Sequence, residues 1–303
     1  MRQALTLQRL SPLRQEWIRC TLPFRSGVVH SEKDAARLRQ YSVDGSPNSE
    51  ASRGGFPLTR WSAILAARSG DSSERSRALD TLLAAYWKPI YKYIRLRWSK
   101  SPEDAQDLTQ DFFFRLLDKD WLGSFDPRRA RLRTFLRACA DNLVSNHHRA
   151  GQRQKRGGGS PPLSLDFAAA DGELSRLQPS APPEMDEFFD REWARSVFTV
   201  GVERLRAELT ARGKSVCFQV FERYDLQDAL PDAPDRRPSY QDLARDLRIS
   251  PTDVTNFLAA ARRDFRRIVL DFIREMTSSD EEFRREARAL LGADPPGSAE
   301  AHE

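Results

Sequence analysis

The chain has 303 residues, of which 39% are hydrophobic and 31% charged, and its formal net charge is +5. This composition argues against a membrane protein and against an unfolded polyelectrolyte, and no apolar run reaches the roughly 18 residues that a membrane-spanning helix needs. Cys20, Cys139 and Cys217 stand far apart, without the paired spacing of a zinc site or a disulfide framework. We therefore expect a protein of the reducing cytoplasm, with no membrane partner and room for two domains of ordinary size.

Residues 1–55 show no sustained hydrophobic periodicity and are rich in Ser, Gly, Arg and Pro. This composition predicts a mostly disordered N-terminal arm. An Arg-rich leader is also typical of a transit peptide, although Glu16, Glu32 and Asp34 argue against one. A wrongly assigned start codon is a further alternative.

Residues 56–156 have the periodicity of helices, with apolar residues three and four apart, as in Leu79, Leu82 and Leu83. Pro102, at a first-turn position that tolerates proline, begins a third helix, and turn residues at 123–127 end it. A fourth helix is expected over about 131–149. The alternation typical of β-strands is absent, so we assign this segment to one helical domain.

Gly, Ser and Pro gather over residues 157–183, the composition of a flexible linker with stiff proline sections. A second block with helical periodicity follows over residues 184–276, and residues 277–303 are interpreted as a C-terminal tail. The sequence thus predicts an all-α protein of two helical domains joined by a flexible linker.

Two helix starts follow each other closely near the C-terminus. Ser239 with Asp242, and Ser250 with Asp253, have the spacing of capping boxes, and Pro251 stands at the first helical position of the second helix. Five apolar residues are placed to form the shared core of two crossed helices: Leu243, Leu247, Ile249, Val254 and Phe257. This is the pattern of a DNA-binding helix-turn-helix.

The turn between these two helices carries Arg248 where glycine is usual, which places a non-glycine residue in a less favoured conformation at a cost of about 1 kcal/mol. The second helix would expose six polar residues to a DNA groove: Thr252, Asp253, Thr255, Asn256, Arg262 and Arg263. Asn and Thr read base edges, whereas the arginines grip phosphate. Because any two short capped helices share this pattern, a purely structural helix pair is the alternative.

The third helix has one apolar and one acidic half when each residue is turned by 100°. The apolar half contains Ala105, Leu108, Phe112, Phe113, Leu116 and Leu117. The other half contains Asp104, Asp107, Asp111, Arg115 and Asp118. Taken alone, such an acidic face is most often an ordinary solvated surface.

The fourth helix and the residues around it hold the positive charge of the chain. Nine basic residues and one acidic residue, Asp141, lie between Arg128 and Arg156, which gives this segment +8. The helical phase buries Leu132, Phe135, Leu136, Cys139 and Leu143. It leaves Arg133, Arg137, Asp141, Asn142, His148 and Arg149 on an outer arc that suits the DNA backbone.

The order of residues in these two helices resembles a known family. Asp104-Ala-Gln-Asp-Leu-Thr-Gln-Asp-Phe-Phe113 resembles the polymerase-binding helix of RNA polymerase sigma factors, and Leu132–Leu143 with the basic run that follows resembles their promoter-melting segment. Over about residues 60–156 and 188–275 the chain resembles the extracytoplasmic-function (ECF) type. The resemblance implies that Asp107, Gln110 and Asp111 contact core RNA polymerase.

The resemblance also implies that the fourth helix and the preceding loop capture an unstacked base at the minus-ten element. The residues assigned to this DNA contact are Arg129, Arg131, Arg133, Arg137, Asn142, His148, Arg149 and Arg153. Many relatives carry tryptophan where this chain has Phe135, for which we favour a core role. The C-terminal helix pair would read the minus-thirty-five element. An anti-sigma factor is left open as a further partner.

The sequence has no Ser-His-Asp order, no phosphate-binding glycine loop and no metal-spaced cluster, so we expect no catalysis, metal or cofactor. Two other function classes stay open. These are a stand-alone helix-turn-helix regulator and a recombinase or transposase-like enzyme. Neither accounts for an acidic helix followed at once by a basic one.

Overall fold

The computed structural model describes residues 72–118, 121–126, 128–150, 163–177, 184–226, 238–277 and 279–292. Every regular element in these ranges is helical, which confirms the all-α prediction. The elements are α5 (Ser72–Arg97), α6 (Pro102–Asp118), η3 (Trp121–Ser124), α7 (Leu132–Ala150), α8 (Phe167–Leu177), α9 (Met185–Ala211), α10 (Ser215–Phe221), the π-helical turn η4 (Glu222–Leu226), α11 (Tyr240–Leu247), α12 (Pro251–Glu275) and α13 (Asp280–Leu291). The N-terminal arm expected at residues 1–55 and the proposed contact Arg153 lie outside the described residues.

The helix starts expected from the sequence are present. α6 begins at Pro102, and Ser101 Oγ accepts a hydrogen bond from the Asp104 N–H. Complete capping boxes precede α11 and α12, at Ser239 and Ser250. Arg248, between α11 and α12, adopts the left-handed conformation with φ 55° and ψ 44°, as its place in the turn predicted.

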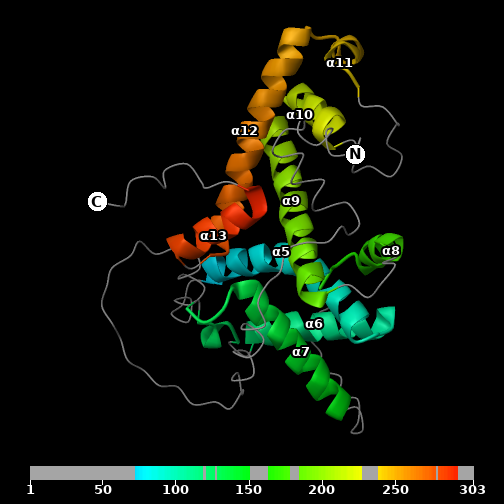
Figure 1. The fold of residues 1–303 in the computed structure, drawn as a ribbon, viewed down its shortest axis with the longest axis vertical. Coiled ribbons are helices and arrows are strands. Elements are labelled where there is room, and N and C mark those ends of the chain that lie inside the picture. The colour runs from blue at the N-terminus through cyan, green and yellow to red at the C-terminus, as the bar shows by residue number, and fades with distance from the viewer. Residues whose placement is uncertain are drawn as a thin grey trace, which may run out of the picture.

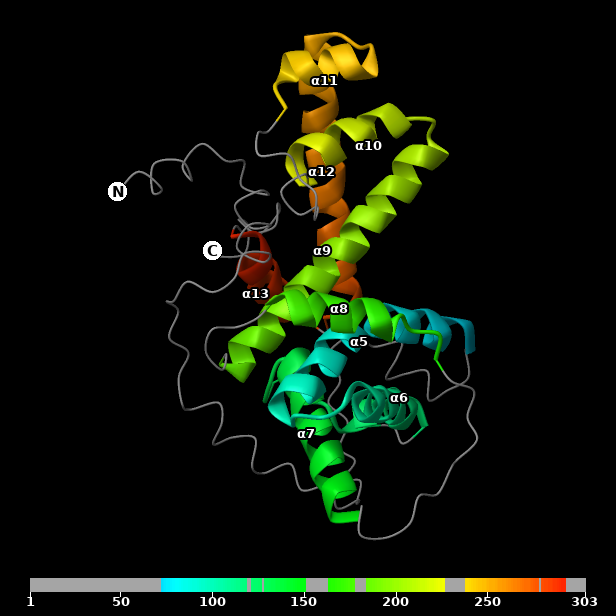
Figure 2. The same ribbon diagram turned by 90° about the vertical axis from the view of Figure 1, so that its right-hand side faces the viewer.

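α9 is the longest helix of the described residues; it crosses α5 and packs against α12 (Figures 1 and 2). Gly201 allows the close approach of α9 to α12. A Cβ built on it would lie 2.9 Å from Val269 Cγ2 and 3.0 Å from Phe265 Cε2. A side chain at this position would therefore push the two helices apart.

A continuous hydrophobic core runs from α5 to α13. It includes Ile90 of α5, Phe112 of α6, Phe198 of α9 and Phe272 of α12, all fully buried. A smaller cluster joins α10, α11 and α12, with Leu243 and Val254 at its centre and Leu247, Ile249 and Phe257 packed against it. The two helical blocks expected from the sequence thus pack on one another here.

The expected linker and the expected C-terminal tail each contain a helix. Within the expected linker at 157–183, α8 packs on α5, and its Phe167, Ala170 and Leu174 are buried. Within the expected tail at 277–303, α13 buries Phe283 and Leu290 against the core. Both segments therefore contribute buried apolar area, which stabilises the fold.

Candidate nucleic-acid interface

α6 presents a mixed acidic and apolar face. Asp107 is exposed, while Gln110 and Asp111 are half-buried, and Asp111 Oδ1 accepts a hydrogen bond of 2.8 Å from Arg115 Nε. Phe114 shares this face, because positions 107, 110, 111 and 114 follow one side of a helix. Its side chain is 43% exposed, which is unusual for a large apolar residue.

The opposite side of α6 anchors the helix. Leu108, Phe112, Phe113 and Leu116 are buried, as the helical phase predicted. Phe114 was not among the residues predicted for this surface, and it stands in a run of three phenylalanines. Its angular position, seven residues after Asp107, was the signal that separates it from its two buried neighbours.

The inner side of α7 is also placed as expected. Phe135 is buried and packs against Phe125, with ring centroids 5.3 Å apart, so its core role is confirmed. Burial raises the pKa of the Cys139 thiol to about 12. Cys139 therefore stays protonated and belongs to the packed side of the helix.

The outer arc of α7 differs from the prediction, because Arg133 is only 5% exposed. Its Nε lies 2.8 Å from Asp190 Oδ1, its NH1 donates to Glu286 Oε2, and its guanidinium lies 4.7 Å from the centre of the Trp193 ring. Burial alone lowers the pKa of Arg133, but the carboxylates of Glu286 and Asp190 outweigh it and raise the pKa. The expected exposure of Arg133 is corrected accordingly.

Two further arginines of this segment are also engaged by carboxylates. Arg131 Nε lies 3.6 Å from Glu286 Oε1, and Arg137 NH2 donates to Asp186 Oδ2 at 2.7 Å. Burial and the nearby Arg133 lower the pKa of Arg131. The three inward arginines therefore meet acidic residues of α9 and α13 in this arrangement.

The remaining residues expected to bind the minus-ten element lie at the surface. Arg129 is exposed in the loop before α7, and Asn142, His148 and Arg149 are exposed along its C-terminal half. Asp141, expected on the same arc, is instead half-buried and accepts hydrogen bonds of 2.9 Å from Tyr93 Oη and Trp98 Nε1. The open basic surface of α7 is thus confined to the helix ends.

The N-terminal end of α12 exposes Thr252, Thr255 and Asn256 to solvent. Asp253 is occupied locally, because its Oδ2 accepts hydrogen bonds from the backbone N–H and the hydroxyl of Ser250. These hydrogen bonds from Ser250 lower the pKa of the Asp253 carboxyl. Asp253 therefore serves the helix cap, and the Thr255 hydroxyl donates a hydrogen bond of 3.2 Å to the Pro251 carbonyl. Thr252 and Asn256 are exposed where a DNA groove could meet them.

The two arginines expected to grip phosphate differ from each other. Arg263 is exposed, while Arg262 donates two hydrogen bonds, of 2.7 and 2.8 Å, to the buried Asp225 of η4. Hydrogen bonding to Asp225 raises the pKa of Arg262. Arg262 therefore links α12 to η4 in this structure. The expectation that it faces DNA phosphate is corrected.

The two candidate surfaces lie at opposite ends of the long axis of the molecule, α7 at one end and the start of α12 at the other (Figures 1 and 2). α9 and α12 span the distance between them. An extended ligand, rather than a compact one, is needed to touch both.

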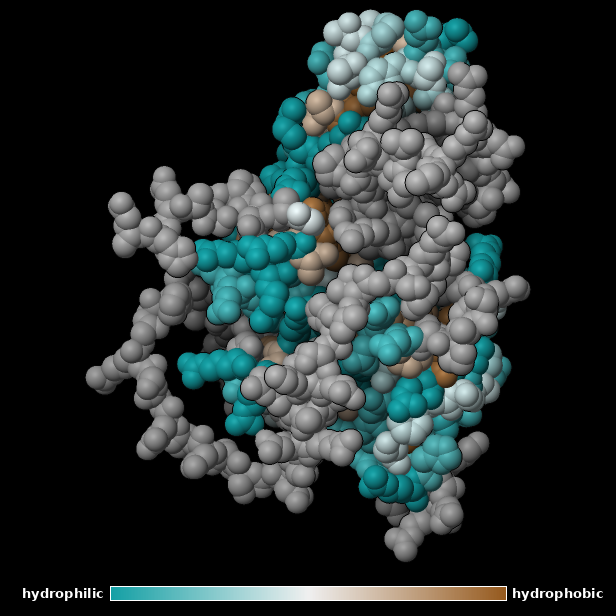
Figure 3. Space-filling model, viewed as in Figure 1, coloured by the Kyte–Doolittle hydropathy of each residue, from teal (hydrophilic) through white to brown (hydrophobic). Residues whose placement is uncertain are grey.

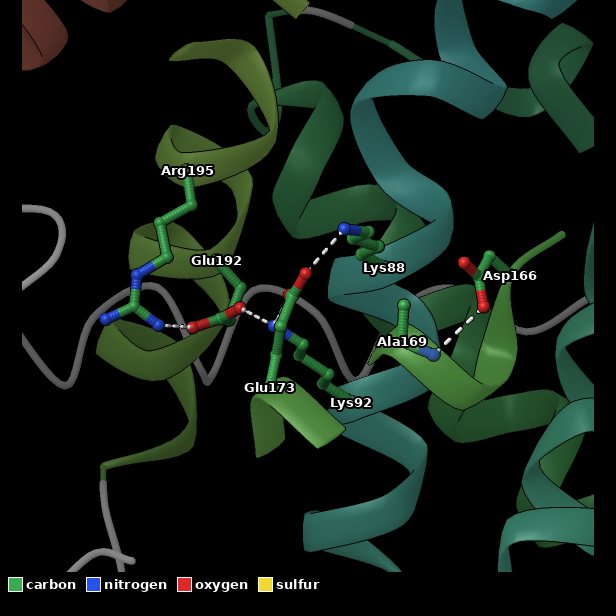
Figure 4. A network of polar contacts seen from close by, with 7 residues as sticks. All are labelled: Lys88, Lys92, Asp166, Ala169, Glu173, Glu192 and Arg195. Carbon is green, nitrogen blue, oxygen red and sulfur yellow. Dashed lines mark hydrogen bonds and ion pairs between the residues drawn. The ribbon is translucent and has the colours of Figure 1, made fainter. Parts of the chain in front are cut away.

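A partly buried ion-pair network links α5, α8 and α9 (Figure 4). Lys92 Nζ donates to Glu192 Oε2 at 2.6 Å and to Glu173 Oε2 at 2.7 Å, and Lys88 Nζ donates to Glu173 Oε1 at 2.7 Å. Lys92 and Glu192 are almost fully buried, and Arg195 also pairs with Glu192. The network connects three helices that are distant in the sequence. It was not predicted from the sequence.

In the described ranges, no group of His, Cys, Asp and Glu side chains has the arrangement of a metal site. No described helix is long and apolar enough to cross a membrane.

Comparison with known proteins identifies a family match for one part of the chain. Residues 82–154 match the family model described as Sigma-70 region 2, a segment that begins in α5 and contains α6 and α7. No curated protein and no solved structure matches the chain significantly. The matched segment coincides with the acidic α6 and the basic α7, so this part of the chain is similar to region 2 of the sigma-70 family of RNA polymerase sigma factors, which act in transcription initiation.

Proposed function

We propose that this protein is an ECF-type sigma factor that binds core RNA polymerase through α6 and opens promoter DNA through α7. The observation that carries the proposal is that the region 2 match covers an exposed acidic helix followed directly by a basic one. Members of the sigma-70 family bind core polymerase and promoter DNA without catalysing a reaction themselves.

The polymerase-binding surface in this proposal consists of Asp107, Gln110, Asp111 and Phe114. The carboxylates would steer and orient a basic partner surface. Phe114, an exposed aromatic side chain at the end of this face, would supply the apolar anchor that interfaces usually need. Loss of the carboxylates should therefore lower the association rate with polymerase, whereas loss of Phe114 should shorten the lifetime of the complex.

The minus-ten contact in this proposal uses Arg129, Asn142, His148 and Arg149, which are exposed. Arg153 would extend this contact toward the C-terminal side. Extracting one base from the stack costs a few kcal/mol, which contacts along the phosphates must offset.

The minus-thirty-five contact would use α11 and α12 as a helix-turn-helix. Its support is the pair of capping boxes, the single left-handed residue Arg248 between the helices, and the exposed Thr252 and Asn256 on the second helix. Arg263, the exposed arginine of the pair, would contact phosphate. Asn256→Ala should then change sequence preference, whereas Arg263→Ala should weaken binding to all sequences evenly.

The experiment that tests the proposal is co-elution of the full chain with bacterial core RNA polymerase, followed by transcription from a promoter library. Asp107→Asn and Phe114→Ala should weaken co-elution without loss of helicity, since both side chains are exposed. The matched control is Asp271→Asn, an exposed aspartate of α12 on another surface. No association of the wild-type chain with polymerase would contradict the proposal and favour a stand-alone DNA-binding regulator.

A further inference from the structure

Three arginines in the first half of α7 and just before it find their partners outside the segment that matches sigma-70 region 2. Arg137 pairs with Asp186 and Arg133 with Asp190, both on α9, and Arg131 and Arg133 share Glu286 of α13. These carboxylates form ion pairs with guanidinium groups that nucleic-acid phosphates would otherwise bind. We name the three acidic residues Asp186, Asp190 and Glu286 the carboxylate clamp.

The enclosure of Arg133 is the strongest part of this arrangement. The guanidinium lies between Glu286, Asp190 and the face of Trp193, and Glu286 itself is buried. No phosphate can reach Arg133 while α13 and the start of α9 stay in place. Contact between Arg133 and DNA therefore requires that these two elements move.

α13 is built as a separate amphipathic helix. Ser279 Oγ caps its N-terminus by accepting from the Glu282 N–H, and Gly292, with φ 67°, ends it. Phe283, Ala287 and Leu290 face the core. Hydrophilic residues cover the outward side of the helix (Figure 3). Its capped ends allow it to leave the core as one unit.

Two polar atoms around Arg133, one on α9 and one on α13, lack a hydrogen bond. Trp193 Nε1 and Glu286 Oε1 have no hydrogen-bond partner in the described part of the chain, and both residues line a cavity of about 10 Å³. Buried ion pairs also contribute little net stability, because the desolvation of both charges opposes their attraction. The clamp thus holds Arg133 firmly in place without adding much to the stability of the whole fold.

We propose that the carboxylate clamp is an autoinhibitory contact: α13 and the start of α9 compete with nucleic-acid phosphates for Arg131, Arg133 and Arg137. The inference rests on the proposed function, because it adds these three arginines to the DNA contact proposed there for α7. In the free chain the carboxylate clamp keeps DNA phosphates away from these three arginines. DNA binding by the full basic face follows release of α13.

The test measures the affinity of the full chain, without polymerase, for a fluorescent single-stranded oligonucleotide of mixed sequence. The clamp variant is Asp186→Asn with Glu286→Gln. The control is Glu203→Gln with Glu281→Gln. It also removes one negative charge from α9 and one from α13, but at exposed positions. The clamp variant should bind roughly five-fold or more tightly than the control, the usual lower range for coupled sites.

Equal affinities of the two variants, or no DNA binding by either, would overturn the clamp. Because Glu286 is buried, Asp186→Asn alone serves as the second variant. Its target side chain is 69% exposed, so the fold is preserved, and a smaller increase in affinity is expected. An unchanged affinity in this variant counts against the clamp in the same way.

Amide hydrogen exchange of the wild-type chain gives an independent measurement. Exchange in α13 should rise when the oligonucleotide binds, while α5 stays protected. Unchanged protection of α13 in the bound state would overturn the inference. The proposed function fails separately, by absence of co-elution with core polymerase, because neither measurement of the clamp contains polymerase.

Discussion

Arg262 and Asp225 join α12 to η4 through two hydrogen bonds, from Nε to Oδ2 at 2.7 Å and from NH2 to Oδ1 at 2.8 Å. The Asp225 side chain is almost fully buried, whereas Arg262 keeps a quarter of its side chain exposed. Arg262 therefore stabilises the approach of η4 to α12.

Arg262→Ala should lower the free energy of unfolding by about 2 kcal/mol, because the buried Asp225 would lose its bidentate partner. The matched control, Arg263→Ala, should change stability by no more than about 0.5 kcal/mol, since Arg263 is exposed. Urea denaturation followed by circular dichroism measures both. Equal losses from the two variants would remove the structural role of Arg262.

Gly201→Ala should destabilise the protein by about 1–3 kcal/mol, since the new methyl group would meet Val269 and Phe265 at the crossing of α9 and α12. Gly172→Ala in α8 is the control, because its Cβ would meet nothing within 4 Å. It should stabilise by up to about 1 kcal/mol through helix propensity. Thermal unfolding of both variants checks that the two effects have opposite signs.

Arg248→Gly should stabilise the protein by up to about 1 kcal/mol, because glycine adopts the left-handed conformation at position 248 without the steric penalty of a Cβ. Arg248→Ala keeps the Cβ and should leave stability nearly unchanged. Chemical denaturation distinguishes the two substitutions. A gain from alanine equal to that from glycine would show that the arginine side chain, rather than the backbone, is unfavourable.

The network around Glu173 predicts a loss of stability in acid. Burial would raise the pKa of Glu173, but Lys92 and Lys88 outweigh it and hold the pKa below its ordinary value. A depressed folded-state pKa contributes stability that is fully present above the unfolded-state value, about 4.3, and is lost as the pH falls through the folded-state value. The unfolding free energy should therefore decrease from about pH 5 downward.

Glu173→Gln should flatten this part of the pH profile, because the amide cannot titrate. Glu203→Gln, at an exposed position of α9, should leave the profile as it is in the wild type. Denaturation midpoints measured across this acidic range compare the three chains. A profile of Glu173→Gln as steep as that of the wild type would show that other carboxylates carry the acid sensitivity.

Local features of this fold follow from the sequence because neighbours in the chain determine them. The helical phase gives the buried sides of α6 and α7, including Phe112 and Phe135, and the capping boxes at Ser239 and Ser250 mark two helix starts. Each of these features depends on residues within two turns of a helix.

The features that the sequence analysis missed depend on distant partners. Arg133 meets Glu286, 153 residues further along the chain, and Lys92 meets Glu192, 100 residues away. A charged residue on the outer side of an amphipathic pattern is normally solvated, so the pattern alone assigns both to the surface. In α8, the helical spacing of Phe167, Ala170 and Leu174 was not recognised because Gly- and Pro-rich segments lie on both sides of it.

The long α9 bears on which promoters this chain can use under the proposed function. Its 27 residues correspond to a straight rod of about 40 Å, and Lys92 and Glu192 fasten it to α5 near one end. Each base pair added between two promoter elements shifts them by roughly 3.4 Å and rotates them by about 35° about the DNA axis. The part of α9 that follows Glu192 stays a rod of constant length after Asp186 and Asp190 release α7, so it cannot follow such changes. The spacer between the two elements should therefore tolerate little variation in length.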